Sequence, residues 1–217
     1  MEDRRDTDAE EREERQRKEE TRAHARRHPL FMAQVVVKAR SRQCPEDVWD
    51  VHLLPATDPG KDELGHPTGS YELSSAVFAL KPRSRGHVRL AGRDPRMPPV
   101  IEHGFLADLA DLEVLVDGLV LLRRLGSGEP LSRFTAGEVR PGPDVDPEAY
   151  VRETVRGYFH PVGTCALGAV VDGGGAVLGY ENVYVADASV MPTIPRSNTN
   201  LSTLGVAEKI AAGLAAA

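Results

Sequence analysis

The residues best suited to chemistry lie near the end of the chain. His160 is followed by Pro161 and, two residues later, by Gly163. Histidine is the side chain that most readily accepts and releases a proton near neutral pH. Pro161 restricts the backbone after it, and Gly163 lets a ligand approach the main chain closely. His160 could therefore act as a general base, although a single histidine beside aromatic residues is more often structural.

A second group of small and polar residues lies downstream of His160. The apolar run 183–186 ends at Asp187-Ala188-Ser189, and Asn198-Thr199-Asn200 precedes a helix-forming stretch. We expect the run to be a strand that could be fully buried. Nucleotide cofactors bind at the carboxyl ends of strands in open α/β sheets, and helix N-termini favour electron-rich ligands. Spacing alone fits an ordinary strand–loop–helix connection at least as well.

The overall composition excludes several classes of protein. The 217 residues carry a formal net charge of −6, so no nucleic-acid partner is indicated. No apolar run is long enough to span a membrane, and the charged N-terminus is unlike a secretory signal. Cys44 and Cys165 are far apart and match no metal-ligand spacing. We therefore expect no metal site, two buried reduced thiols and a cytoplasmic location.

Residues 1–28 differ in composition from the rest of the chain. Acidic and basic side chains are mixed there, with few apolar residues that could be buried. Pairs at helical spacing, such as Glu11 with Arg15, favour a solvated helix that ends at Pro29. We expect a helical or disordered arm, with docking to another chain as the alternative.

The next stretch has the pattern of an antiparallel sheet. Apolar and β-branched residues indicate four short strands near 35–37, 48–54, 71–80 and 87–90. Glycine and proline residues between 57 and 69 predict a loop. No helical pattern separates these strands, so we expect them to form one antiparallel sheet.

Helical patterns follow the strands. The apolar spacing of 108–125 predicts a helix that covers one face of the sheet, with Gly126 as its C-cap. Asp146 and Pro147 predict the N-cap and first residue of a second helix, which leads to His160. Small and apolar residues in 201–217 predict a third helix, capped by Asn198 or Asn200. The fold class is therefore α+β.

Three segments together resemble one family of flavoproteins. They are His160-Pro161-Val162-Gly163-Thr164-Cys165, the run from Val183 to Pro192, and Asn198-Thr199-Asn200 with the later Ala207-Glu208-Lys209. Their order is similar to the C-terminal signature of the glucose–methanol–choline (GMC) oxidoreductases. The stretch from Pro82 to Leu90, with the prolines after it, resembles the substrate-domain sheet of that family. The resemblance covers about residues 30–215.

The resemblance implies an FAD-dependent oxidation of an alcohol. His160 would be the base that takes the hydroxyl proton, and Asn198 would orient the substrate oxygen. Asp187, Ala188, Asn198, Thr199 and Asn200 would line the flavin. The implied organisation is a substrate-binding domain at 29–157, followed by 158–217, which would complete an FAD domain with a strand and a helix.

One part of the family pattern is missing from this sequence. GMC members begin with a strand–turn–helix unit that carries Gly-x-Gly-x-x-Gly for the FAD pyrophosphate, and these 217 residues contain no such turn. We therefore expect the C-terminal part of a split or truncated enzyme, with a partner chain for the missing half and an exposed apolar patch that would contact it. The alternatives are a non-catalytic or regulatory subunit that docks on an FAD-binding partner, and a free-standing binding module.

Overall fold

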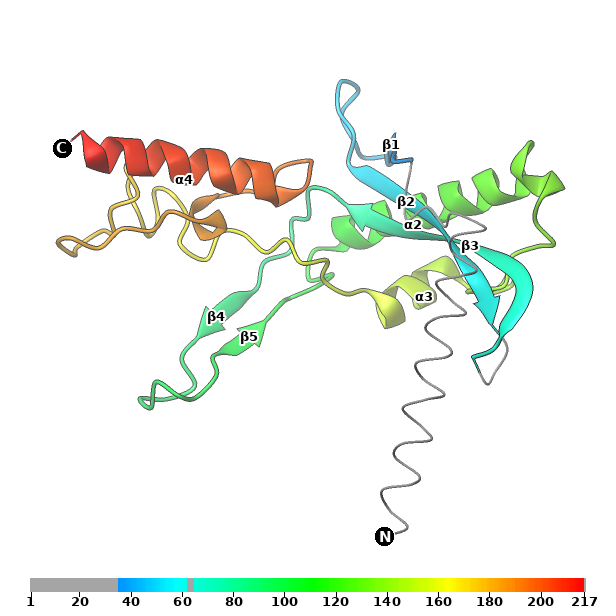
Figure 1. Ribbon diagram of the computed structural model, residues 1–217, viewed down its shortest axis with the longest axis horizontal. Helices are drawn as coiled ribbons and strands as arrows, with labels where there is room; N and C mark the ends of the chain where they lie inside the picture. Colours follow the sequence, from blue (N-terminus) through cyan, green and yellow to red (C-terminus); the bar gives the residue numbers. More distant parts are fainter. Residues whose placement is uncertain (1–34, 62–64, 217) are drawn as a thin grey trace, which may run out of the picture. The chain divides into compact units, whose positions relative to one another are not determined.

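The computed structural model describes residues 35–61 and 65–216, so the charged arm expected at 1–28 lies outside the described residues. Small antiparallel sheets and helices make up the described chain, which confirms the α+β class (Figure 1). The chain divides into two compact units. One includes Leu54–Ser75, and the other consists of Val37–Leu53 and the chain from Ala76 onward. All the predicted site residues belong to the second unit, which we call the larger unit.

The first sheet has the strand order β1-β2-β3. Its strands are β1 (Val37–Ala39), β2 (Val51–Lys61) and β3 (Pro67–Ala79). β1 and β2 are antiparallel, with Val37 opposite Leu53. Val51 and Leu53 are buried while His52 between them is less so, as the alternating pattern predicts. The alternation therefore determines which face of β2 packs against the rest of the larger unit.

The loop expected at 57–69 is wrong at both ends. β2 continues to Lys61 and β3 begins at Pro67, so most of the expected loop is strand. The glycine and proline residues predicted a loop, but they are compatible with strand here because β1 pairs with β2 only as far as Leu53. Beyond that residue one edge of β2 has no neighbour among the described strands, and proline is tolerated at an unpaired edge because no N–H is needed there.

The expected single sheet is also wrong, because β4 (His87–Arg89) does not join β1–β3. It pairs with β5 (Val100–Glu102) in a separate antiparallel ribbon, with Val88 opposite Ile101. The prolines between the two strands lie in the turn of this hairpin, in which Met97 N–H donates to the carbonyl of Asp94 at 3.1 Å.

Helix α2 (Leu109–Ser127) forms almost as expected. Its N-cap is Asp108, whose carboxylate accepts a hydrogen bond from Ala110 N–H at 2.9 Å. The helix continues past the predicted cap Gly126 and ends at Gly128. A Cβ added at Gly126 would meet no atom within 4 Å, so nothing outside the helix opposes its continuation there.

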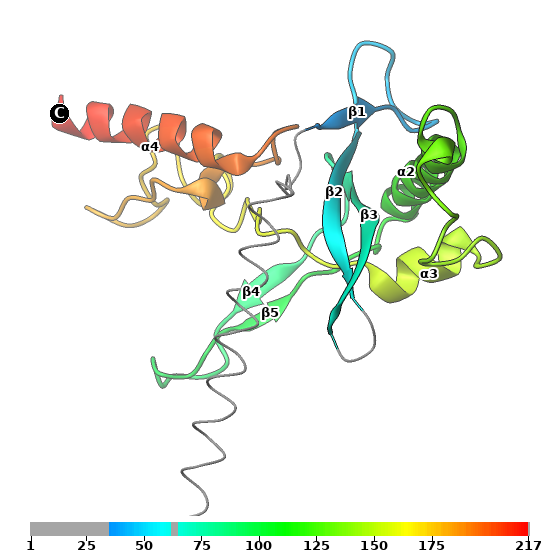
Figure 2. The ribbon, with the colours of Figure 1, turned by 45° about the vertical axis from the view of Figure 1, so that its right-hand side comes forward.

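A glycine sets how closely α2 packs on the first sheet. A Cβ added at Gly118 would lie 2.4 Å from Val77 Cγ1 and 3.1 Å from Val51 Cγ1. Figure 2 shows α2 beside the ends of β2 and β3 that belong to the larger unit. The helix therefore covers one face of that part of the sheet, as predicted, and it does so through a position that has no side chain.

Helix α3 (Pro147–Thr154) follows the short 3₁₀ helix η1 (Leu131–Arg133). The predicted N-cap Asp146 accepts a hydrogen bond from Ala149 N–H at 2.8 Å, and Pro147 is the first helical residue. Leu112 and Leu119 of α2 pack against Val151 of α3. This apolar contact holds the two helices together and directs the chain toward His160.

The C-terminal segment contains the 3₁₀ helix η2 (Ala188–Val190) and α4 (Thr199–Ala215). Val171 and Val190 are fully buried and pack with Ile210 of α4. The run 183–186 is not the buried strand expected. It makes an isolated bridge from Tyr184 to Ala176, and the exposed fraction of Val183 and of Tyr184 is 46%. Among the described residues its pairing is limited to this one bridge, which is too short to bury its side chains in a sheet.

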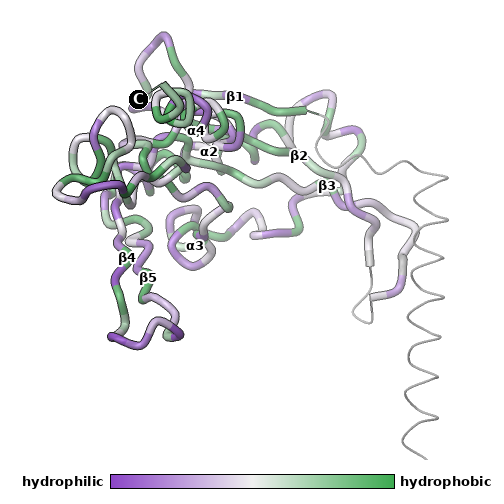
Figure 3. Tube along the Cα trace, turned by 60° about the vertical axis from the view of Figure 1, so that its left-hand side comes forward, coloured by the Kyte–Doolittle hydropathy of each residue, from purple (hydrophilic) through white to green (hydrophobic). Residues whose placement is uncertain are grey.

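Several large apolar side chains of this segment are exposed. The exposed fraction is 79% for Leu201 and 54% for Leu204, both on α4. Figure 3 colours hydrophobic residues green, and α4 carries this colour over part of its length. Exposure of this kind is what the sequence predicts for elements that would pack on another polypeptide. Across residues 35–61 and 65–216, no helix is both long enough and apolar enough to cross a membrane.

Candidate active site

His160 lies in the extended segment that leaves α3. Phe159 before it has a φ of 54°, a left-handed conformation that is uncommon for a phenylalanine, and its side chain is 90% exposed. The rings of Tyr158 and His160 pack edge to face, with centroids 5.7 Å apart. The left-handed residue Phe159 therefore lies between two residues, Tyr158 and His160, whose rings are in contact.

The imidazole of His160 contacts the first residue of α4. Nδ1 of His160 lies 3.1 Å from Oγ1 of Thr199, whose side chain is buried. A hydroxyl can either donate or accept, so this contact can hold the ring in one orientation with either neutral tautomer. Because the contact uses Nδ1, Nε2 is the ring nitrogen that remains for a substrate proton.

Asn198 and Asn200 lie at the beginning of α4 with exposed side chains. Asn198 is the N-cap residue by backbone position, but its side chain makes no capping hydrogen bond, contrary to the expected role. Its carboxamide is therefore not engaged in holding the helix. No hydrogen bond in the described part of the chain joins Asn198 to His160, and the bonded neighbour of His160 is Thr199.

Asp187 and Ala188 lie at the beginning of η2. Asp187 Oδ1 accepts hydrogen bonds from the hydroxyl of Ser189 at 2.5 Å and from its N–H at 2.8 Å. The Ser189 hydroxyl, followed by its N–H, lowers the pKa of Asp187 below the usual value. Cys165 N–H in turn donates to the Ser189 carbonyl at 2.9 Å. The turn at 187–189, which was predicted to bind the cofactor, is thus held by the Asp187 carboxylate and by a backbone hydrogen bond from Cys165.

Sequence reasoning missed an aromatic row that ends at His160. The ring of His52 on β2 lies 5.7 Å from that of Phe78, and Phe78 lies 4.5 Å from Tyr158, which packs on His160. In the sequence these residues stand in alternating strand patterns or beside the histidine, and nothing in the spacing joins them. The contact depends on β2, β3 and the segment after α3 meeting in space.

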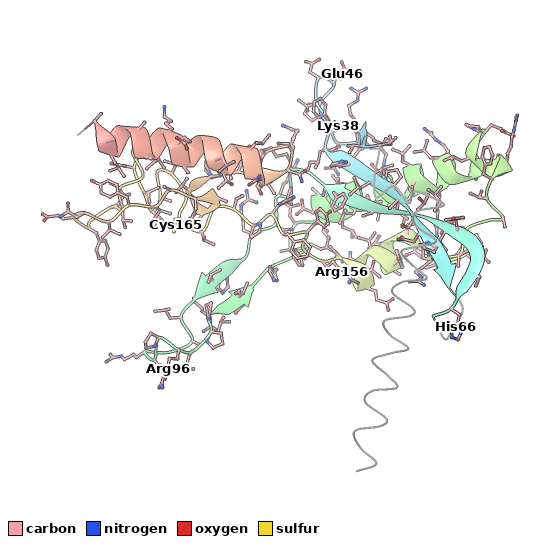
Figure 4. All side chains as sticks on the ribbon, in the orientation of Figure 1. Lys38, Glu46, His66, Arg96, Arg156 and Cys165 are labelled. Carbon is pink, nitrogen blue, oxygen red and sulfur yellow. The ribbon has the colours of Figure 1, made fainter. Side chains whose placement is uncertain are left out.

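The nitrogen Nε2 of His52 is buried and has no hydrogen-bond partner among the described residues. Burial lowers the pKa of His52, and the positive charge of Lys38 lowers it further. Lys38 lies on β1, where Figure 4 labels it, and its Nζ is 4.3 Å from the centre of the Trp49 ring. His52 therefore favours the neutral form more than an exposed histidine does, and its Nε2 is left without a hydrogen bond among the described residues.

Two cations hold the loop that precedes Asn198. Lys81 Nζ donates to Oγ1 of Thr193 at 3.2 Å and to the carbonyl of Ile194. Arg196 Nε donates to the carbonyl of Trp49 at 2.9 Å, next to β2. The loop is thus tied to the ends of the two strands that carry His52 and Phe78.

The two cysteines are free and half-buried, whereas the sequence predicted buried thiols. Figure 4 labels Cys165 in the segment beside α4. Burial, followed by a hydrogen bond to Asp50, raises the pKa of the Cys44 thiol. Within the described ranges, no group of three His, Cys, Asp or Glu side chains could hold a metal ion.

Comparison with known proteins identifies the family. The family model described as GMC oxidoreductase, C-terminal part, matches residues 82–207, which is more than half of the chain. The chain belongs to the GMC oxidoreductase family. The matched stretch contains His160, Asp187 and Asn198, and the resemblance seen in the sequence is confirmed.

Among sequence relatives, an oxygen-dependent choline dehydrogenase of Klebsiella pneumoniae (strain 342) is 38% identical over 143 residues. That match covers 62% of this chain and 26% of the relative. The oxygen-dependent choline dehydrogenase 1 of Chromohalobacter salexigens is 35% identical over 145 residues, with the same coverage. The chain therefore spans about a quarter of the length of these relatives.

Solved structures agree on the fold. Pyridoxine 4-oxidase from Mesorbium loti superimposes with a TM-score of 0.72 at 23% identity, covering 84% of this chain and 38% of the oxidase. A formate oxidase of Aspergillus oryzae, studied for its FAD modification, gives 0.67 at 28% identity over 77% of this chain and 31% of its own. A fungal aryl-alcohol oxidase gives 0.61 at 29% identity over 76% and 27%. The fold class is that of GMC oxidoreductases.

Proposed function

We propose that this chain supplies the base and the substrate-facing residues of an FAD-dependent alcohol oxidation. The observation that carries the proposal is the contact between His160 Nδ1 and Thr199 Oγ1 at 3.1 Å. It orients an imidazole whose Nε2 remains for proton transfer, within a segment matched by the GMC family model. Choline and aryl-alcohol are named as substrates of the relatives, so a small alcohol is the substrate class.

In the proposed reaction the chain's own residues handle the proton. Nε2 of His160 takes the hydroxyl proton of the alcohol as its carbon is oxidised to a carbonyl. The carboxamide of Asn198 donates a hydrogen bond to the substrate oxygen. The aromatic row extends from His160 through Tyr158 and Phe78 to His52. FAD, when bound, would serve as the two-electron acceptor for the hydride that leaves this carbon. A positioned base of this type contributes roughly 10²–10⁴ to the rate.

The residues at the start of α4 and η2 fit a flavin. Asn198 leaves its carboxamide free, and no side chain caps the first N–H groups of α4 among the described residues. Such N–H groups suit the oxygen and nitrogen atoms of a flavin ring. Asp187, Ala188, Asn198, Thr199 and Asn200 would line that ring. The capped turn at Asp187 supports this assignment because it holds Ala188 in a defined backbone conformation.

These 217 residues contain no Gly-x-Gly-x-x-Gly turn that would bind the FAD pyrophosphate. We infer that a partner polypeptide with a Gly-x-Gly-x-x-Gly unit packs on the exposed apolar side chains of 158–217, and that 29–157 forms the substrate-binding part. Leu201, Leu204 and Phe159 are exposed and supply apolar surface for that contact. Burying such surface stabilises an interface by about 25 cal/mol per Å² before the costs of association.

The test is to produce the chain together with a candidate FAD-binding polypeptide, one that carries a Gly-x-Gly-x-x-Gly unit. We expect a yellow complex whose flavin is bleached by a small alcohol in the absence of oxygen. His160→Gln should slow that bleaching by about 10²-fold or more while flavin stays bound. The matched control is His103→Gln, which alters an exposed histidine stacked on Phe105.

Two results would contradict the proposal in different ways. A complex that never retains flavin would remove the cofactor assignment. A complex that binds flavin but is equally active with His160→Gln would leave the cofactor and remove the base. A stable flavin complex without activity toward any alcohol would favour a regulatory subunit.

A further inference from the structure

A cavity of about 440 Å³ lies within the larger unit. It is bordered by the turn after β1, the segment that follows β3, the first turns of α2 and the loop before Asn198. Its ionisable lining is mostly basic, with four cationic side chains and two carboxylates: Lys81, Arg83, Arg85, Arg196, Asp50 and Asp111. The excess of positive charge suits an anionic occupant.

None of the four cationic side chains has a carboxylate partner among the described residues, and Lys81, Arg85 and Arg196 donate to carbonyls or hydroxyls instead. Lys81 bonds to Thr193 and Ile194, and Arg196 donates through Nε to the Trp49 carbonyl. These contacts use only some of the available donors. One N–H of Lys81 and the two terminal nitrogens of Arg196 have no acceptor in the described part of the chain. Lys81 and Arg196 are therefore held in position and still have N–H donors available for a ligand.

Arg85 folds back on its own turn. Its Nη1 donates to the carbonyls of Pro82, Arg83 and Ser84 at 3.0–3.1 Å. These bonds hold the guanidinium at the mouth of the cavity and leave Nη2 without an acceptor among the residues described. Arg85 thus adds a third positioned cation to Lys81 and Arg196.

The two carboxylates are already engaged by neutral donors. Asp50 accepts hydrogen bonds from the N–H and the hydroxyl of Ser41, at 2.8 and 2.6 Å. Asp111 accepts from the N–H groups of Arg83 and Ser84, at 2.7 and 2.8 Å. Both oxygens of each carboxylate therefore accept hydrogen bonds from neutral groups of the protein. Neither carboxylate forms a hydrogen-bonded ion pair with a cation of the cavity among the described residues.

The cations also act on one another. Burial lowers the pKa of Lys81, and the charges of Arg196 and Arg85 lower it further. Like charges gathered around a partly buried ammonium destabilise it unless an anion is bound nearby. The arrangement thus has an unfavourable charge that a negatively charged ligand would relieve.

We propose that this cavity binds a small oxyanion, a phosphate or a carboxylate group, between Lys81, Arg85 and Arg196. The planar guanidinium groups can each offer two parallel donors to such a group, and the ammonium adds a point charge. The proposal does not rest on alcohol oxidation, because none of the residues that carry it belongs to the His160 or Asn198 assignments.

The experiment titrates inorganic phosphate, and separately malonate, into the purified full chain by calorimetry in chloride buffer. We expect one saturable site, and the tighter of the two probes identifies the class of group. The double variant Arg85→Gln with Arg196→Gln should weaken binding by about tenfold or more. The matched control, Arg93→Gln with Arg156→Gln, removes two exposed arginines outside the cavity and should leave the affinity unchanged.

A second measurement covers the case in which the double variant does not fold. NMR titration of the Lys81 side chain in the unsubstituted protein should show its pKa rising when phosphate is added, because a bound anion stabilises the ammonium. Equal affinity for phosphate in both double variants, or no response of Lys81, would overturn the proposal. Loss of phosphate binding when the FAD-binding polypeptide is added would also overturn it, since protein would then fill the cavity.

Discussion

Thr199 Oγ1 lies 3.1 Å from Nδ1 of His160, across 39 positions of sequence. Thr199 is the first residue of α4, and it is buried although polar. Because α4 is packed through Ile210 onto Val171 and Val190, the hydroxyl is held by a packed helix rather than by a loop. The orientation of the histidine therefore depends on the packing of the C-terminal helix.

Replacing Thr199 with valine tests this dependence. Valine keeps the shape of the buried side chain and removes the hydroxyl, so the imidazole loses its hydrogen bond. In the proposed complex with an FAD-binding polypeptide, we expect flavin reduction to slow by about fivefold, the equivalent of one hydrogen bond of about 1 kcal/mol. Thr199→Ser should restore most of the rate. Equal rates for the valine and serine variants would contradict the assigned role.

His52 should make stability depend on pH. Burial lowers its pKa below the ordinary 6.5, so the unfolded chain takes up the proton first as the pH falls. The stability due to neutral His52 is therefore complete above about pH 6.5 and declines as the pH falls toward the lowered pKa. His52→Phe should flatten this decline between pH 7.5 and 5.5 in urea unfolding. His103→Phe, at an exposed position, should keep the original slope, and a His52→Phe curve with that same slope would contradict the prediction.

Gly118→Ala should destabilise the fold although alanine favours a helix. The new methyl group would lie 2.4 Å from Val77 Cγ1, and overpacking of this kind costs about 1–3 kcal/mol. The gain in helix propensity is at most about 1 kcal/mol. Gly126→Ala in the same helix meets nothing within 4 Å and should be neutral or stabilising. Thermal unfolding of the two variants measures the difference, and similar midpoints would refute the close approach of α2 to the sheet.

Asp187 should contribute stability that acid removes. Its pKa is lowered by the Ser189 hydroxyl and N–H, so its contribution is present above its ordinary value near 3.8 and is lost as the pH falls through the lowered pKa. Asp187→Asn should therefore be less stable than the unsubstituted chain at pH 6, and the difference should begin to shrink as the pH falls below about 4. Ser189→Ala should show part of the same effect. Curves that stay parallel down to pH 3 would show that the carboxylate is not held in this way.

Local signals predicted the helices well. Asp108 and Asp146 are N-caps in the structure because a carboxylate that accepts from a first-turn N–H is a short-range interaction. The fold class followed from the order of strands before helices. His160 and Thr199 could be selected by motif, but their contact could not, because it depends on where α4 packs.

Pairing between distant segments was not predictable in the same way. β5 was missed because Val100–Glu102 is a short run directly after two prolines and forms a strand only by pairing with β4. The segment 183–186 is apolar enough for a strand, but its pairing among the described residues is limited to one bridge, with two hydrogen bonds to 175–177, so no extended strand forms. The row from His52 to His160 likewise arises from tertiary contact alone.

Helix α2 also works as a spacer between two turns. Asp111 holds the backbone N–H groups at 83–84, and Asp117 holds Arg42 through its N–H and side chain, both at 2.8 Å. The two aspartates are six residues apart, which in an α-helix is a rise of about 9 Å. The distance between the two turns that border the cavity is thus set by the rise of the helix between Asp111 and Asp117. Inserting one residue between the aspartates would rotate one by about 100° relative to the other, and the two turns could no longer both be held.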